Sequence, residues 1–448
     1  MKKIFALTVL TLFSFSAFSS ALDSIKREKW NDIEVVWLED SKFPKFHADI
    51  YFSDGAINDN TPGITQATFD QLSFGTSKES RKELAEFFDF YGAKVRPYVS
   101  HEYSVVSVQG LLKDIKPVFE KVCELFNDAQ YPAHELSSYV SRSKSALRNL
   151  VTNHAGLAER VFRKQTLQGT PYVSPVEGNL GSFDKLTSAG LKARLTSLNS
   201  AKKKIYLSGP SEVKKLKDII KNCQWKSEHQ VATQKVSKPA SQSTIYLVPV
   251  EGANQAQIRI GRVITPAEFN NKEVQFSFLS GFLGGNFTSK LVQELRVKRG
   301  LTYSAGAYVS TQRDYGRAGV STFSKTETAA ETISVIRDIF TELSAGKITP
   351  EEFKHQQGNQ IGSFSFGFEE TSAFLGQVLI YDHQGRDLKE LFGYPEKVKS
   401  LTTKSLSQAN IEAFPWEKLT IVVVGDKSLE KSLSRIRPVK VLNFQDFL

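Results

Sequence analysis

The stretch FLSGFLGGNFTSKLVQELRVKRGLTYSAGAYVS, residues 278–310, carries the most specific pattern in the chain. Gly284 and Gly285 end one predicted helix and permit a close turn, because glycine has no Cβ. A second helix is predicted over 287–299, with an apolar face, and Gly300 ends it. Alternating apolar residues from Leu301 onward then predict an outgoing strand.

Two polar side chains stand at the junction of this second helix and the strand. Arg296 falls in the last helical turn and Tyr303 at the start of the strand. We expect both to face one cleft, where a guanidinium and a phenol can donate to peptide carbonyls or to a developing oxyanion. Two structural roles stay open: a charge satisfying the helix dipole, and an aromatic packed on the sheet. The neighbouring Lys298 and Arg299 rank lower.

The segment 278–310 resembles the second-half signature of the insulinase/pitrilysin-like zinc metallopeptidase family, which includes mitochondrial processing peptidase-like proteins. The shared features are Leu-Gly-Gly, Phe–Thr–Ser, a Leu–x–x–Glu–Leu–Arg helix and Gly–Leu–x–Tyr–Ser. The resemblance covers the mature chain, more weakly outside 256–310. It implies two clam-like halves around a peptide. It also implies that Arg296 and Tyr303 are the substrate-binding pair of the family, and favours that role over the structural ones.

The zinc motif of the family is replaced in this chain. Active members carry His–x–x–Glu–His before a Gly–Thr, and a further Glu some seventy residues later completes the ligands. Here the segment 63–77 reads GITQATFDQLSFGTS, so Gln66, Phe69 and Asp70 occupy the three motif positions. The downstream Glu is expected within 141–149, SRSKSALRN, which contains no acid.

The chemistry of these replacements argues against zinc in this chain. Gln is a poor zinc ligand, Phe cannot act as a base, and one Asp alone cannot hold the ion. The seven His residues offer no relocated motif, since neither His101-Glu102 nor His134-Glu135 has a His three residues further on. No Gly–x–Ser–x–Gly elbow is present either. We therefore predict no metal, no other cofactor and no catalytic triad.

Two pairs of segments indicate an internal repeat. Residues 115–136 (IKPVFEKVCELFNDAQYPAHEL) resemble 333–353 (ISVIRDIFTELSAGKITPEEF), and 203–216 (KKIYLSGPSEVKKL) resemble 419–433 (LTIVVVGDKSLEKSL). The offset is nearly the same in both pairs, which favours duplication over chance recurrence. We predict an α+β fold of two homologous sandwich halves. The expected divisions are a signal peptide at 1–21, halves at 22–225 and 244–448, and a linker at 226–243.

Periodicity places strands and helices alternately within each half. The strand candidates are Ile33–Trp37, Ala48–Phe52, Val105–Val108, Ile205–Ser208, Ile245–Pro249, Ala256–Ile260, Ala305–Ser310, Ala318–Phe323 and Leu419–Val424. The helix candidates are 62–74, 79–91, 112–127, 133–153, 210–222, 270–283, 287–299, 326–345, 350–362 and 402–413.

The first residues have the pattern of a secretory signal. Lys2 and Lys3 precede an apolar stretch from Ile4 to Phe18, and small residues follow before Leu22. We expect export to the bacterial periplasm or secretion, with no membrane span once the signal is removed; an uncleaved anchor is the lesser alternative. Leu22 also stands where a lipoprotein would need a cysteine.

Charge and cysteine content narrow the range of partners. The formal net charge is +10, but basic residues are mixed with acids along the chain, so we predict no nucleic-acid binding. An acidic peptide or an anionic surface stays open. Cys123 and Cys223 are the two cysteines. Two separate buried thiols are the favoured interpretation, and a disulfide is the alternative that export permits.

The sequence thus favours a non-catalytic subunit of a heterodimeric exported zinc peptidase. A homologous partner would supply His–x–x–Glu–His and zinc, and this chain would supply Arg296 and Tyr303 to a peptide substrate. One alternative is a periplasmic peptide-binding or chaperone-like module without a catalytic partner. Another is a hydrolase with an unrecognised site.

Overall fold

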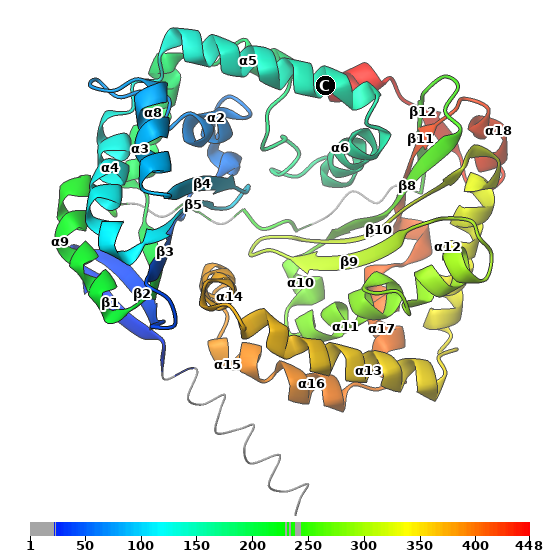
Figure 1. Cartoon of the computed structure of the whole chain (residues 1–448). Coiled ribbons are helices and arrows are strands. Elements are labelled where there is room, and N and C mark those ends of the chain that lie inside the picture. Colours follow the sequence, from blue (N-terminus) through cyan, green and yellow to red (C-terminus); the bar gives the residue numbers. More distant parts are fainter. Residues whose placement is uncertain (1–21, 23, 229–230, 233, 238–242) are drawn as a thin grey trace, which may run out of the picture. The chain divides into compact units, whose positions relative to one another are not determined.

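The computed structural model describes residues 22, 24–228, 231–232, 234–237 and 243–448 of the 448-residue chain. The predicted signal peptide at 1–21 lies outside the described residues, and the predicted linker at 226–243 lies only partly within them. The chain divides into two compact units (Figure 1). The first extends to Ser141 and includes Val176–Ala232 and Phe366–Gly393. The second comprises Arg142–Pro175, Thr233–Ser365 and Tyr394–Leu448.

A six-stranded mixed sheet forms the centre of the first unit. Its strand order is β1-β2-β6-β3-β5-β4, and only β2 and β6 run parallel. The strands are β1 (Lys26–Trp30), β2 (Ile33–Glu39), β3 (Lys45–Phe52), β4 (Lys94–Val99), β5 (Ser104–Leu111) and β6 (Lys203–Gly209).

One face of this sheet packs into an apolar core. Phe46 and Phe52 alternate along β3 and contact Phe119 and Phe126 from an amphipathic helix. The helices of the first unit are α2 (Ile64–Asp70), α3 (Arg81–Phe90), α4 (Ile115–Asp128), the first part of α5 (Ala133–Arg148), α7 (Leu180–Phe183), α8 (Ser188–Ser200), α9 (Leu216–Ile220), α14 (Thr371–Gln384) and α15 (Leu388–Phe392).

The second unit contains a sheet of the same design. Its order is β12-β7-β11-β8-β10-β9, with β7 parallel to both β11 and β12 and the other neighbours antiparallel. The strands are β7 (Ile245–Pro249), β8 (Gln255–Ile264), β9 (Ala305–Thr311), β10 (Gly316–Lys325), β11 (Thr420–Gly425) and β12 (Val439–Val441). Strands β6 and β11, which come from the predicted repeat, occupy corresponding central places in the two sheets.

Helices cover both faces of the second sheet. On one side, α11 and α12 enclose the larger apolar core, and on the other side lies α6 (Figure 1). The helices of this unit are α6 (His154–Leu167), α10 (Pro266–Phe269), α11 (Glu273–Gly284), α12 (Ala329–Ser344), α13 (Pro350–Phe364), α16 (Tyr394–Ser400), α17 (Thr403–Ala413) and α18 (Leu429–Leu433).

Each unit includes a helix from the other half of the sequence. Leu157, Val161 and Phe162 of α6 pack on Val422 and Val424 of the second sheet. Helix α14, by contrast, is held on the first sheet largely by polar contacts. Its Asp382 accepts hydrogen bonds from Arg27 at 2.8 and 3.0 Å and from Tyr206 at 2.9 Å, and its His383 bonds Tyr51 and Glu102 at 2.9 and 2.7 Å. The predicted continuous halves therefore differ from the compact units by these exchanged segments.

The predicted α+β class with two sheets is confirmed, and all nine predicted strands are present. The sequence did not indicate β1, β4 or β12, nor helices α6, α8 and α14. The helix predicted over 287–299 is corrected: regular helix begins only at Lys290 and changes to a π-helix over Val292–Val297. Within the described residues, no helix is both long and apolar enough to cross a membrane.

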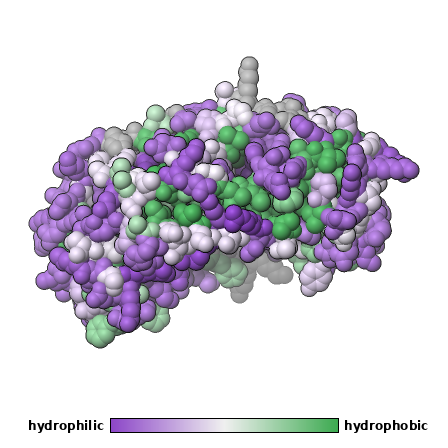
Figure 2. All heavy atoms as spheres, turned by 90° about the horizontal axis from the view of Figure 1, so that it is seen from above, coloured by the Kyte–Doolittle hydropathy of each residue, from purple (hydrophilic) through white to green (hydrophobic). Residues whose placement is uncertain are grey.

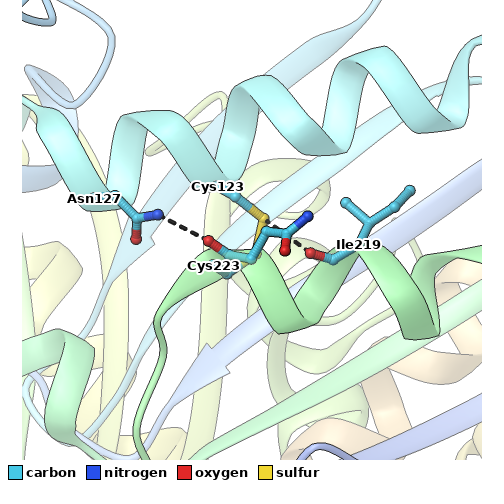
Figure 3. The surroundings of a disulfide bond; sticks show 5 residues. Cys123, Asn127, Ile219 and Cys223 are labelled. Carbon is cyan, nitrogen blue, oxygen red and sulfur yellow. Dashed lines mark hydrogen bonds between the residues drawn. A yellow bond between two sulfur atoms is a disulfide. The ribbon is translucent and has the colours of Figure 1, made fainter.

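The two cysteines form a disulfide, which corrects the favoured interpretation of separate thiols (Figure 3). Cys123 lies in the buried face of α4, and Cys223 follows α9, which packs alongside α4. Asn127 of α4 donates to the Asn222 carbonyl at 2.9 Å and fixes the same contact. Sequence separation of 100 residues hid this pairing from local patterns.

Candidate functional site

The segment that ends at Arg296 is shaped by a helix terminus and a glycine. The Lys298 N–H donates to the Gln293 carbonyl at 3.0 Å, the wide spacing of a π-turn. Gly300 has a φ of +62°, which favours glycine, and the Leu301 N–H then returns to the Leu295 carbonyl at 2.8 Å. These bonds turn the chain back toward β9 and bring Tyr303 beside Arg296. Single π-turns within helices are often found at functional sites.

Arg296 lies between two aromatic rings. Its guanidinium carbon is 4.4 Å from the centre of the Tyr303 ring and 5.3 Å from that of Phe287. Both rings are exposed, Tyr303 at 72% and Phe287 at 60%. A guanidinium over ring faces is attracted by their negative quadrupoles, and the stacking leaves its in-plane N–H groups free to bind an acceptor. The structure therefore brings the two predicted site residues together and adds Phe287, which the sequence analysis did not single out.

Arg296 differs from the neighbouring Lys298 and Arg299 in its ion pairing. Glu294 bonds Lys298 at 2.7 Å and Arg299 at 2.6 Å, and Lys290 lies 3.8 Å away. Burial alone would raise the pKa of Glu294, but these cations hold it below its ordinary value. No ion pair or side-chain hydrogen bond joins Arg296 to any residue that the structure describes. The lower ranking of Lys298 and Arg299 agrees with this arrangement, since an internal acid engages both.

The backbone that carries Tyr303 is fixed by buried hydroxyl groups. Thr302 Oγ1 accepts from the Ser304 N–H at 3.1 Å, and Thr322 Oγ1 donates to the Ser304 carbonyl at 2.9 Å. The side chains of Thr302 and Thr322 are both buried, whereas the side chain of Tyr303 is exposed. The phenol is thus presented outward from a rigid support, as a binding residue requires.

Close packing of α11 on β9 explains the glycines of the motif. A Cβ on Gly284 would overlap the backbone nitrogen of Ala307, so only glycine permits this approach. Ser280 of α11 accepts the Val309 N–H at 2.7 Å. The helix therefore satisfies part of the outer edge of β9 and holds the strand that follows Tyr303.

The degenerate zinc positions form a separate cluster in the first unit. Gln66 and Asp70 lie one helical turn apart on α2, where Gln66 Nε2 donates to Asp70 Oδ1 at 2.8 Å. Tyr139 of α5 donates to the other carboxylate oxygen at 3.1 Å. Phe69 points instead into the core, with its ring 5.4 Å from that of Phe52. A hydrogen-bonded trio thus stands where the family resemblance implied ligands, and no carboxylate occupies the place of the base.

The Asp70 carboxylate is engaged by hydrogen bonds from neighbouring side chains. Burial raises the pKa of Asp70, and the hydrogen bonds from Gln66 and Tyr139 offset part of that rise. Across the part of the chain that the structure describes, no group of three or more His, Cys, Asp or Glu side chains is placed to hold a metal ion. Sequence analysis missed Tyr139 because it lies 69 residues from Asp70 and just before the 141–149 window.

Exposed hydrophobic side chains mark the surface near the Arg–Tyr pair. The face in Figure 2 is mostly hydrophilic, with hydrophobic residues gathered in patches. Phe287, Val297 and Tyr303 are among the large hydrophobic residues that stay exposed in the described chain, and all three come from one short stretch. Such a grouping favours a binding surface.

Comparisons with known proteins agree with this fold. Residues 199–359 match a family model described as the peptidase M16 inactive domain. The chain is 19% identical over 440 residues to the non-peptidase homolog YmxG of Helicobacter pylori, covering 96% of this chain and all of that protein. It is 22% identical over 331 residues to an uncharacterized zinc protease of Streptomyces coelicolor, covering 71% and 72% of the two chains.

Solved structures share the fold over nearly the whole chain. The peptidase M16 inactive domain from Pseudomonas fluorescens superposes with a TM-score of 0.82 at 20% identity, covering 90% of this chain and 98% of that one. A protease from Helicobacter pylori gives 0.77 at 18% identity, covering 89% and 99%. The fold is shared with peptidase M16-like structures, and the family model that matches residues 199–359 describes an inactive domain. The predicted resemblance to the insulinase/pitrilysin-like, or M16, family is confirmed, and specifically to its inactive domains.

Proposed function

We propose that this chain is the substrate-binding, non-catalytic subunit of an exported zinc peptidase. A homologous partner with His–x–x–Glu–His would bind zinc and activate the water. This chain would contribute Arg296 and Tyr303, which hold the substrate backbone and donate to the oxyanion of the tetrahedral intermediate. The observation that carries the proposal is the Arg296 guanidinium, stacked between two exposed rings and without an acid partner among the described residues.

The replaced motif supports the same division of labour. Gln66 and Asp70 engage each other and Tyr139, so the first unit offers neither a water-activating base nor a ligand set. The Arg–Tyr stack is nonetheless fully formed. A chain that assists catalysis at the zinc site of a partner subunit is expected to lose its own zinc motif and to keep its Arg296–Tyr303 pair. The disulfide supports export, because such bonds persist in oxidising compartments.

Reconstitution with a zinc-motif partner tests the proposal. The purified mature chain alone is expected to cleave no peptide, and the mixture is expected to cleave one in a chelator-sensitive manner. Arg296→Ala and Tyr303→Phe in this chain should each lower kcat of the mixture about 100-fold, the scale of one lost oxyanion donor. Lys298→Ala is the matched control, because Glu294 already engages Lys298. Full activity of both site variants would refute the assigned role.

The alternative is a peptide-binding or chaperone-like module with no catalytic partner. The exposed aromatic residues around Arg296 favour peptide binding in either case. Purification of the chain from its native source distinguishes the two. Co-purifying peptides without a zinc-motif protein would support the module, whereas a stoichiometric zinc-motif protein would support the peptidase subunit.

A further inference from the structure

The second sheet leaves part of one face without a covering helix. Helix α6 packs on β11 and β8 of this face, and β10 and the edge strand β9 extend beyond it (Figure 1). On one side of β10, Arg317, Ser321 and Phe323 are half-buried, whereas the residues on the other side are buried, which indicates an open face there. The strand pairing places Gly306 opposite Ser321, Tyr308 opposite Gly319 and Ser310 opposite Arg317 on that face. The floor of the surface is thus made largely of small residues.

One aromatic ring lies flat across this floor. A Cβ on Gly319 would fall 2.6 Å from both the hydroxyl oxygen and the adjoining ring carbon of Tyr308. The phenol therefore extends over Gly319 toward β8. Among the described residues, no hydrogen bond is made by this hydroxyl, although it is not sealed from solvent. A donor of this kind at a half-open surface is available to a ligand.

A guanidinium lies near the same phenol: the Arg317 guanidinium carbon is 5.9 Å from the centre of the Tyr308 ring. Arg259 and Arg317 both lie beside one acid, Glu159 of α6. Glu159 lies 3.2 Å from Arg317 Nη2 and 3.6 Å from Arg259 Nε. One carboxylate thus serves more than one guanidinium.

The hydrogen bonding within the cluster is also incomplete. The enclosed Nε–H groups of Arg259 and Arg317 have no hydrogen-bond acceptor, and Arg259 is 7% exposed. The Nη1 and Nη2 groups of Arg259 donate to the backbone carbonyls of Ile258 and Ala155. Two guanidinium groups, those of Arg259 and Arg317, thus share one carboxylate, and in this pair the donors exceed the acceptors.

We propose that this surface, formed by Tyr308 and Arg317 beside α6, binds a carboxylate side chain of a peptide. Burial raises the pKa of Tyr308, so its hydroxyl stays protonated and can donate to the carboxylate at neutral pH. The guanidinium of Arg317 supplies the charge and a planar pair of donors. The net charge of +10 on the chain favours the same acidic class of ligand.

The position of the surface predicts where the acid stands in the substrate. Tyr303 and Tyr308 are five residues apart, so their Cα atoms are separated by at most about 17 Å. If the Arg296–Tyr303 pair holds the scissile peptide bond, as the proposed function requires, the acid lies within about five residues of that bond in an extended peptide. Only this spacing rests on the proposed function.

Fluorescence anisotropy of the isolated mature chain with dye-labelled, end-capped twelve-residue peptides tests the site. The paired probes carry one Glu or one Gln in an otherwise neutral sequence. The Glu peptide should bind on the order of tenfold more tightly at low salt, and Arg317→Gln should abolish that preference. Tyr308→Phe, which keeps the ring over Gly319, should reduce it several-fold. Lys325→Gln, on the same face of β10 and exposed, is the matched control and should leave it unchanged.

Equal binding of the two peptides, or a preference that survives in both Arg317→Gln and Tyr308→Phe, would overturn the proposal. The binding assay needs no partner and no cleavage, so its result stands apart from that of the reconstitution. A reconstituted mixture that cleaves peptides with no acid preference would refute this site alone. A Glu preference without any partner-dependent cleavage would refute the proposed function alone.

Discussion

The centre of the Tyr303 ring stands 4.4 Å from the guanidinium carbon of Arg296, although six residues and a helix terminus separate them in the chain. The Arg296 guanidinium lies over the rings of Tyr303 and Phe287, and contact with a ring face leaves the in-plane N–H groups able to bind an acceptor. The pair is therefore ready to bind before any ligand arrives. Holding the donors in place lowers the entropic cost of binding.

The ring of Phe287 is expected to help orient the Arg296 guanidinium. Phe287→Ala should lower partner-dependent cleavage about threefold to tenfold, because Arg296 loses one of the two faces that orient it. The free energy of unfolding should change by less than about 1 kcal/mol, since Phe287 is exposed. Steady-state kinetics and urea denaturation check both parts. Val297→Ala, exposed in the same stretch, serves as control, and an equal effect there would contradict the specific role of Phe287.

Restoring the zinc motif should not restore a zinc enzyme. Phe69→Glu places a carboxylate where a ring packs against Phe52, and should lower the free energy of unfolding by about 3–5 kcal/mol or more. Gln66→His and Asp70→His alone should cost less, because both positions are half-buried. The triple variant that combines Gln66→His, Phe69→Glu and Asp70→His should bind no stoichiometric zinc by elemental analysis. The third ligand, the Glu expected within 141–149, is still missing in it. Stoichiometric zinc in a folded triple variant would show that the cluster is more adaptable than its contacts indicate.

Reduction of the disulfide should destabilise the first unit. The bond closes a loop of 100 residues, and removing such a constraint costs about 2–5 kcal/mol. Chemical denaturation of the Cys123→Ala/Cys223→Ala variant should show that loss. Adding a reductant to the wild type should reproduce it, and adding it to the variant should have no effect. Equal stability of wild type and variant would contradict a structural role for the bond.

Lys203 predicts a pH dependence of stability. Its ammonium donates to the carbonyls of Asn199, Ala201 and Lys226 at 2.6, 2.8 and 2.9 Å, and burial lowers its pKa to about 7. Between pH 7 and about 10, the unfolded chain therefore binds a proton that the folded chain lacks, and stability rises with pH. The slope contributed is at most about 1.4 kcal/mol per pH unit.

Urea denaturation between pH 7 and 9.5 measures this contribution. Lys203→Met should be less stable overall, because three carbonyls lose their donor, but should also lose the pH-dependent rise. The difference in slope between the two proteins is the readout. Identical slopes would show that the carbonyls hold the lysine in its charged form throughout this range.

Local patterns accounted for the strands and for the motif around Arg296, because both depend on residues close in sequence. Strand β4 escaped detection because Pro97 interrupts it, and a proline is tolerated only where the sheet has an edge, as β4 does. Tyr139 and Phe287 escaped because their roles depend on contacts rather than on spacing. The function of α14 was equally hidden, since Asp382 and His383 bond residues more than 170 positions away.

The segment Phe366–Gly393 completes the first unit although it is made near the end of the chain. When a ribosome has finished 22–225, the polar face of the first sheet still lacks Asp382 and His383, and Tyr206 and Glu102 lack these partners. The first unit can reach its final state only after most of the protein has been synthesised. For the exported chain of the proposed function, this order keeps the part made first incomplete until α14 is available.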